Sequence, residues 1–227
     1  MWIIERTVAE LLNNPRFQFE SSDEPFISSH SVSEHLMYCI NKYCPDKHLS
    51  EARKIYDALT SYEMKEILNG RGKQDAFVPA PGIKEFLREL KGKHIKIALV
   101  TSGLYEKAIP KIVSAFRSFN MGDPFEFYDS IITAGTALRY GQAGTLGELS
   151  PKPHPWLYAE SARIGLGLTD CDERIIGIED SSAGILSIRL AGFSAIGIEG
   201  GNIEKGGMAP LCDKMFPNLL SSLSYIL

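Results

Sequence analysis

From residue 76 onward, short apolar runs alternate with stretches of helical pattern, and this alternation constrains the fold more than any other feature. The runs have strand length and are rich in β-branched residues; they cover residues 94–101, 130–133, 174–179 and 194–198. Helical sequence follows each of the first three runs. Repeated strand-then-helix units form a parallel sheet with helices on both faces. The sequence therefore predicts an α/β, Rossmann-like domain over residues 76–227.

The first 75 residues carry helical signals only. Apolar side chains recur at helical spacing over residues 2–12 and 31–43, and again in a third segment that follows Ser50. Ser50 is a suitable N-cap for this third helix, and Asn69-Gly70 is a typical C-terminal signal. We therefore expect a separate helical domain over residues 1–75.

Charge and composition narrow the class of protein. The chain has 24 Lys plus Arg against 28 Asp plus Glu, a net charge of −4, which argues against bulk binding to nucleic acid or to an anionic membrane. No apolar run reaches the roughly 18 residues of a membrane span. Glu5 and Arg6 lie where a signal peptide is apolar, so we expect a cytoplasmic protein. The sequence does not indicate an oligomeric state.

Parallel sheets place their chemistry at the carboxyl ends of the strands, and Thr101-Ser102-Gly103 comes at the first of these ends. Two hydroxyl groups and a glycine between a strand and a helix can hold an anion such as phosphate through backbone N–H groups. The alternative is a plain turn with an N-cap.

The second candidate is Lys152, which lies between prolines in the segment 150–155, just before a predicted helix. Prolines stiffen the backbone and reduce the entropy that is lost when one side chain is held in place. A point charge there could bind a phosphoryl group or hold a carboxylate. A solvated lysine in a loop is the alternative.

The third candidate is Glu179-Asp180, two adjacent carboxylates that follow an apolar strand. Adjacent side chains at a strand end point in different directions, so one can face a site while the other supports it. Mg²⁺ is usually held by one or two carboxylates together with water and substrate phosphate. Helix capping by Asp180 is the alternative interpretation.

In order and spacing, Thr101, Lys152 and Glu179-Asp180 resemble motifs II, III and IV of the haloacid dehalogenase superfamily of phosphohydrolases. The resemblance is greatest to the β-phosphoglucomutase and phosphoglycolate phosphatase branch and covers residues 76 to about 200. The matching strings are Pro81-Gly-Ile-Lys-Glu-Phe-Leu, Ile97-Ala-Leu-Val-Thr-Ser-Gly, Lys152-Pro-His-Pro, Ile178-Glu-Asp-Ser-Ser-Ala-Gly-Ile and Leu190-Ala-Gly-Phe. The first 75 residues resemble, more weakly, the helical cap that this branch carries over its site.

This resemblance implies a Mg²⁺-dependent phosphatase or sugar-phosphate mutase that acts on a small phosphorylated metabolite. It assigns Thr101, Ser102 and Gly103 to the phosphoryl group and Lys152 to the developing charge. It assigns Asp180 to the metal, assisted by Glu179. Arg71, near the junction of the two predicted domains, is similar to residues that touch substrate when the cap closes; a solvated linker residue is the alternative.

The family's first motif, Asp-x-Asp-x-Thr at the end of a first strand, has no match. Asp170-Cys-Asp172 has the right spacing but precedes a strand, whereas the motif follows one. In the family this strand is central, between the strands that carry the counterparts of Thr101 and Glu179, and its first aspartate is the nucleophile. We expect that about 15–25 residues, enough for one strand and its connection, are lacking at the front.

Under this expectation, the chain as written binds phosphate weakly and turns over nothing. Three alternatives remain open. One is a non-catalytic family member that binds a phosphorylated ligand or a partner chain. Another is a different doubly wound nucleotide binder, although the chain lacks the glycine motifs of such proteins. The third is a metal-independent dehalogenase, against which the Glu179-Asp180 pair argues.

Overall fold

The computed structural model describes residues 2–27, 32–68, 79–135, 150–168 and 174–227. The chain divides into two compact units, Met1–Ala76 and Phe77–Leu227. Among the described residues, no helix is long and apolar enough to cross a bilayer.

The first unit is helical. Its helices are α1 (Trp2–Leu11), α2 (Glu24–Ile27), α3 (Val32–Tyr43) and α4 (Leu49–Leu68), and a short 3₁₀ turn over Ser21–Asp23 precedes α2. Helices α1, α3 and α4 pack against one another around the fully buried Leu36. Two short helical turns thus lie within residues 16–27, where the sequence has no helical periodicity.

The prediction that Ser50 caps the third helix is wrong. Helix α4 begins at Leu49, so Ser50 lies inside its first turn. The imidazole of His48 takes the capping position instead: its Nδ1 accepts from the Ser50 N–H at 3.3 Å and lies 2.9 Å from the Ser50 hydroxyl. A histidine that precedes a serine can cap in place of the serine, which residue type alone does not indicate.

A buried carboxylate organises the turns of the first unit. Asp23 is fully buried and accepts hydrogen bonds from the Tyr38 hydroxyl at 2.7 Å, the Tyr43 hydroxyl, and the Lys42 ammonium at 2.6 Å. It also accepts from the backbone N–H of Glu20 at 2.8 Å. Burial alone would raise the pKa of Asp23, but these donors lower it to about 2.

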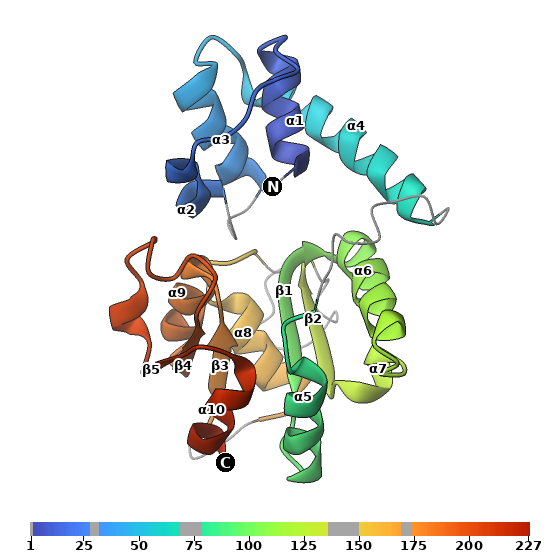
Figure 1. The fold of residues 1–227 in the computed structure, drawn as a ribbon, viewed down its shortest axis with the longest axis vertical. Coiled ribbons are helices and arrows are strands. Elements are labelled where there is room, and N and C mark those ends of the chain that lie inside the picture. The colour runs from blue at the N-terminus through green and yellow to red at the C-terminus, as the bar shows by residue number, and fades with distance from the viewer. Residues whose placement is uncertain (1, 28–31, 69–78, 136–149, 169–173) are drawn as a thin grey trace. The chain divides into compact units, whose positions relative to one another are not determined.

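In its described residues, the second unit contains five parallel strands in two sheets. Strands β1 (Ala98–Leu104) and β2 (Ser130–Ala134) form one sheet. Strands β3 (Ile176–Glu179), β4 (Ser194–Ile198) and β5 (Lys214–Phe216) form the other, in that order. Figure 1 shows the two sheets side by side, with β1 and β3 as their facing edges. The predicted α/β class with parallel pairing is confirmed.

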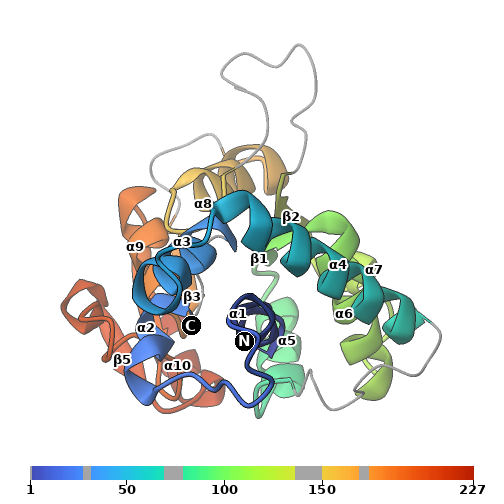
Figure 2. The same cartoon turned by 90° about the horizontal axis from the view of Figure 1, so that it is seen from above.

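Helices cover this unit on both faces of its strands. They are α5 (Ile83–Gly92), α6 (Tyr105–Ser118), α7 (Pro124–Phe127), α8 (Trp156–Glu160, continued by a π-helical turn over Ser161–Gly165), α9 (Ser182–Leu190) and α10 (Leu219–Ile226). Figure 2 shows α8 and α9 on one side of the strands and α5 and α10 on the other. The unit is therefore a layered α/β domain.

Two apolar clusters of the second unit each draw on both sheets. One is built around Phe86 and Leu90 of α5 and includes Ile178 of β3. The other is built around Ile185 and Ile188 of α9 and includes Val100 of β1. Residues from the edge strand of each sheet thus pack into cores that the other sheet shares, which holds the two sheets in one unit.

The limits of β1 differ from the prediction. The strand begins at Ala98 rather than at residue 94, because His94 adopts a positive φ of 58° in the turn after α5. Within that turn, the backbone N–H of Ile95 donates to the Leu90 carbonyl at 3.1 Å. The strand then continues to Leu104, beyond the predicted end. Local backbone capping of α5 therefore overrides the β propensity of residues 94–97.

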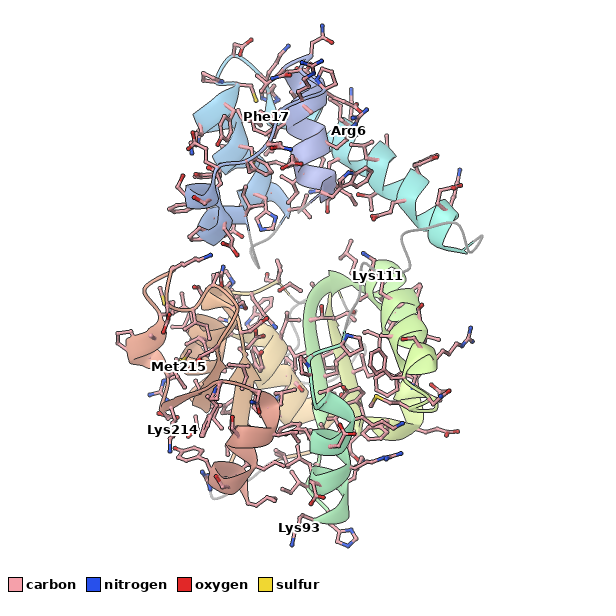
Figure 3. All side chains as sticks on the ribbon, viewed as in Figure 1. Arg6, Phe17, Lys93, Lys111, Lys214 and Met215 are labelled. Carbon is pink, nitrogen blue, oxygen red and sulfur yellow. The ribbon has the colours of Figure 1, made fainter. Side chains whose placement is uncertain are left out.

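The last strand and helix have no counterpart in the prediction. Strand β5 has only three residues, too few for a period-2 pattern to be recognised. Figure 3 shows Lys214 and Met215 on this strand, at the outer edge of the three-stranded sheet. Gly197 of β4 makes room for this strand, since a Cβ atom there would lie 2.1 Å from the Met215 sulfur.

Candidate functional site

The carboxyl ends of β1 and β3 meet around the side chain of Lys152. This residue is buried, with 7% of its surface exposed. Its ammonium forms an ion pair with Glu179 Oε1 and donates to the Val100 carbonyl at 3.2 Å. The structure thus brings together a lysine and a carboxylate that the sequence places 27 residues apart, and it excludes the alternative of a solvated loop lysine.

The β1 end holds the lysine segment through a serine hydroxyl. Ser102 Oγ accepts from the backbone N–H of Lys152 at 3.0 Å. Thr101 Oγ1 accepts from the backbone N–H of Gly103 at 3.1 Å. All three predicted residues lie inside β1, whose pairing is irregular between Thr101 and Leu104, so the alternative of a plain turn with an N-cap at these residues is wrong.

The carboxylate of Glu179 is surrounded by donors. In addition to Lys152, it accepts from the Tyr158 hydroxyl at 2.5 Å and from the Ser181 hydroxyl at 2.9 Å. Burial alone would raise its pKa, but the charge and hydrogen bond of Lys152, together with the two hydroxyl groups, hold the pKa below its usual range. Glu179 therefore stays ionised and holds the ammonium of Lys152 in position.

A glycine lets the first turn of α9 approach this carboxylate. A Cβ atom on Gly184 would lie 2.2 Å from the carboxyl carbon of Glu179. Since real side chains do not reach that separation, the glycine is required by the position of Glu179 rather than by helix conformation.

Asp180 has a different environment from its neighbour. Burial, followed by the negative charge of Glu179, raises the pKa of Asp180. Among the described residues no ion pair holds its carboxylate. The alternative interpretation of Asp180 as a helix cap is wrong, because Ser181 is the N-cap of α9 and its Oγ accepts from the Gly184 N–H at 3.1 Å.

The two carboxylates therefore differ in their capacity to hold a metal ion. Glu179 is already engaged by three side-chain donors, whereas Asp180 offers a carboxylate whose raised pKa would fall beside a cation. Mg²⁺ is commonly held by one or two carboxylates with water and substrate phosphate. The described residues contain no group of three His, Cys, Asp or Glu side chains suited to a metal. They fit Mg²⁺ only in part, through Asp180.

Two residues of this region were missed by the sequence interpretation. Tyr158 of α8 donates its hydroxyl to Glu179. Asn202, in the loop after β4, accepts from the Ser182 backbone N–H at 2.8 Å, and its own N–H donates to the Asp180 carbonyl at 3.0 Å. The other candidates were chosen because polar residues at the carboxyl ends of parallel strands often form the site. The same criterion, applied to the loop after β4, would have identified Asn202. Arg71 lies outside the described residues.

No protein-family model and no curated protein matches the sequence. Solved structures do match it. A predicted phosphoglycolate phosphatase from Haemophilus somnus aligns with 100% of this chain and 89% of its own, at 16% identity and a TM-score of 0.70. The β-phosphoglucomutase of Clostridium difficile aligns with 99% of this chain and 88% of its own, at 21% identity and a TM-score of 0.64.

A third match is a haloacid dehalogenase-like hydrolase from Streptococcus pneumoniae, which covers 99% of this chain and 89% of its own at 19% identity and a TM-score of 0.66. The chain has the haloacid dehalogenase fold. The predicted resemblance to this superfamily is thereby confirmed at the level of the fold. Sequence identities this low support a shared fold and no more.

Proposed function

We propose that this chain is a phosphohydrolase of the haloacid dehalogenase type, which binds a small phosphorylated metabolite at the carboxyl ends of β1 and β3. The observation that carries the proposal is the buried Lys152, held by Glu179 at one strand end and by Val100 and Ser102 at the other. A matching solved structure, CbbY from Rhodobacter sphaeroides, contains phosphate; it aligns with 98% of this chain at 17% identity and a TM-score of 0.64.

In this proposal, the strand-end residues share the work of phosphate binding. The hydroxyls of Thr101 and Ser102, with the backbone at Gly103, face the phosphoryl oxygens. Lys152 neutralises the charge that develops on them, an electrostatic role that gains strength from burial. Glu179 fixes the direction of the ammonium, so it acts as a positioning residue. Arg71, which lies outside the described residues, stays a predicted substrate-binding residue.

The implied Mg²⁺ would be held by Asp180, with Glu179 assisting only through Lys152. When bound, the ion supplies positive charge to the phosphoryl oxygens. The helical unit 1–76 would serve as a cap that excludes water and selects the substrate. The mildly acidic chain argues against nucleic acid as the partner. A small phosphorylated metabolite in the cytoplasm is the partner in this proposal.

Turnover needs an attacking group in addition to these residues. Glu179 is engaged by Lys152, Tyr158 and Ser181, and Asp180 is assigned to the metal. For residues 1–227 by themselves we therefore propose weak phosphate binding without hydrolysis. The same observation favours the second candidate function, a non-catalytic protein that binds a phosphorylated ligand.

Calorimetric titration of the purified chain with inorganic phosphate, with and without Mg²⁺, tests the proposal. We expect weak binding that Mg²⁺ strengthens and that Lys152→Gln abolishes. Lys93→Gln is the matched control, because Lys93 is an exposed lysine after α5 and lies far from the strand ends (Figure 3). Phosphate affinity that is equal in the two variants would reject Lys152 as the binding residue. Mg²⁺-dependent hydrolysis of a phosphate monoester by the unmodified chain would reject the claim that it does not turn over.

A further inference from the structure

The hydroxyl of Tyr158 and the ammonium of Lys152 share one oxygen atom of Glu179. This atom, Oε1, accepts from the Tyr158 hydroxyl at 2.5 Å and forms the ion pair with Lys152. The other carboxylate oxygen accepts from the Ser181 hydroxyl at 2.9 Å. A hydrogen bond from a hydroxyl to a carboxylate is charge-assisted and strong at so short a distance. Two donors therefore draw on the negative charge of a single oxygen atom.

Tyr158 also contacts Lys152 through its ring. The Lys152 ammonium nitrogen lies over the face of the ring, 5.2 Å from its centroid. A cation at this separation is attracted by the negative face of the ring, and more strongly where water is excluded. Both side chains are buried, since Lys152 is 7% exposed and Tyr158 is 8% exposed. The same tyrosine thus acts on the ammonium directly and also through Glu179.

The packing of α8 fixes the position of Tyr158. Its side chain belongs to the apolar cluster around Ile185 and Ile188 of α9, and its neighbour Leu157 is fully buried. Side chains in a close-packed core have little room to change conformation. Burial, followed by the charge of Glu179, raises the pKa of Tyr158 well above its usual value, so the hydroxyl keeps its proton. Tyr158 is therefore a donor whose place is set by the core.

The ammonium of Lys152 has three N–H donors. One is directed at Glu179 Oε1 and one at the Val100 carbonyl, 3.2 Å away. The hydrogen bonds of Lys152 within the described residues use two of the three donors, which leaves the third for an anion. How strongly this donor acts depends on how much of the positive charge Glu179 neutralises.

The Tyr158 hydroxyl reduces the negative charge that Glu179 Oε1 presents to Lys152. Without this donor, the carboxylate would attract the ammonium more strongly and the ion pair would tighten. The effect is large because electrostatic interactions are stronger in a buried site than in water. An anion that approaches the ammonium would then compete with a stronger internal partner.

We propose that Tyr158 is a positioning residue of the phosphate site: its ring holds the Lys152 ammonium in place, and its hydroxyl weakens the ion pair with Glu179 so that the ammonium can bind a phosphoryl oxygen. The inference rests on the proposed function for the identity of the ligand. It adds to that function the residue that adjusts how strongly Lys152 acts.

Heteronuclear NMR of the full chain, with nitrogen-labelled lysine side chains, follows the Lys152 ammonium directly. Its signal is assigned by its absence from Lys152→Gln. Tyr158→Phe removes the hydroxyl and keeps the ring, so we expect the ammonium proton signal to move downfield as the hydrogen bond to Glu179 strengthens. Tyr128→Phe is the matched control and should leave the signal unchanged. Tyr128 is 9% exposed, close to the value for Tyr158, but belongs to the cluster around Phe86.

Titration with inorganic phosphate, followed by the same signal, measures the effect on anion binding. We expect the unmodified chain and Tyr128→Phe to bind phosphate equally. Tyr158→Phe should bind it about fivefold more weakly, the size of effect expected from one net hydrogen bond. A second measurement needs no variant. In the unmodified chain, phosphate that draws the ammonium from Glu179 should shift the Tyr158 hydroxyl proton downfield, because the hydroxyl then becomes the main donor to Oε1.

The possible results separate this inference from the proposed function. If Tyr158→Phe keeps both the ammonium signal and the phosphate affinity of the unmodified chain, Tyr158 has a structural role only and the inference is overturned. An upfield shift, or tighter phosphate binding, overturns it as well, since the hydroxyl then strengthens the hold of Glu179 on Lys152. Absence of phosphate binding by the unmodified chain overturns the proposed function and the ligand-binding part of the inference. The ammonium signal without phosphate then still decides whether Tyr158 positions Lys152.

Discussion

Replacing Lys152 with methionine should destabilise the protein far more than the loss of one surface charge. The Lys152 and Glu179 side chains are only 8% and 10% exposed, so removing the ammonium leaves a carboxylate buried without its counter-ion. Breaking a buried ion pair by removing one partner costs about 3–5 kcal/mol in unfolding free energy. Methionine fills much of the space of the lysine stem, so packing loss adds little.

The matched control is the same substitution at an exposed ion pair. Lys91 and Asp129 also form a pair, at 3.0 Å, but their side chains are 33% and 36% exposed. Exposed pairs contribute about 0–1 kcal/mol, so Lys91→Met should lower the unfolding free energy by no more than that. Urea unfolding followed by circular dichroism gives both values.

A double variant separates the charge from the packing. Glu179→Gln added to Lys152→Met removes the buried charge and keeps the shape of the side chain. We expect it to recover part of the lost stability, because the remaining amide needs hydrogen bonds but no counter-ion. The reasoning is refuted if Lys152→Met loses no more stability than Lys91→Met. It is also refuted if the stability loss of the double variant equals the sum of the losses of Lys152→Met and Glu179→Gln measured singly.

Two further outcomes follow from buried contacts elsewhere. In the helical unit, the pKa of the Asp23 carboxyl group is about 2, below its value in the unfolded chain. The carboxylate therefore contributes stability at pH values above the unfolded pKa, and this contribution is lost as the pH falls toward 2. Asp23→Asn should abolish this pH dependence in acid unfolding curves, and an unchanged curve would contradict the assignment. In α9, Gly184→Ala should cost about 1–3 kcal/mol, since its Cβ would overlap the Glu179 carboxyl group. Gly92→Ala in α5, where a Cβ meets nothing within 4 Å, serves as its control, and equal melting temperatures for the two variants would argue against the overlap.

The parallel α/β class could be predicted from the sequence because buried strands appear in it as short, continuous apolar runs. The strand ends that carry Thr101 and Glu179 followed from the same runs, whereas Lys152 was singled out by the prolines on either side of it. What escaped prediction depends on contacts between segments far apart in the chain. Nothing in the local sequence indicates that Tyr158 donates to Glu179, or that Ser102 binds the backbone of Lys152 across 50 positions.

The adjacent residues Glu179 and Asp180 illustrate the same limit of prediction from local sequence. The sequence indicates that one of the two carboxylates faces the site and the other supports it, but it does not indicate which side chains contact each of them. In the structure, one is saturated by a lysine and two hydroxyls, and the other has its pKa raised by that neighbour. The two acids differ in role because one side chain, that of Glu179, turns toward Lys152. The space for this side chain depends on the glycine of α9 at position 184.

The hydrogen bond between Lys152 and the Val100 carbonyl has a consequence for how a bound anion would influence the junction of the two sheets. The same ammonium also pairs with Glu179, so it touches both β1 and β3 at the proposed phosphate site. An anion that draws the ammonium toward itself competes with these two contacts. Coupling of this kind is reciprocal, so the factor by which phosphate changes the equilibrium of the junction between β1 and β3 is the factor by which that junction changes the affinity for phosphate. Lys152 would then link the packing of the two sheets thermodynamically to the filling of the site.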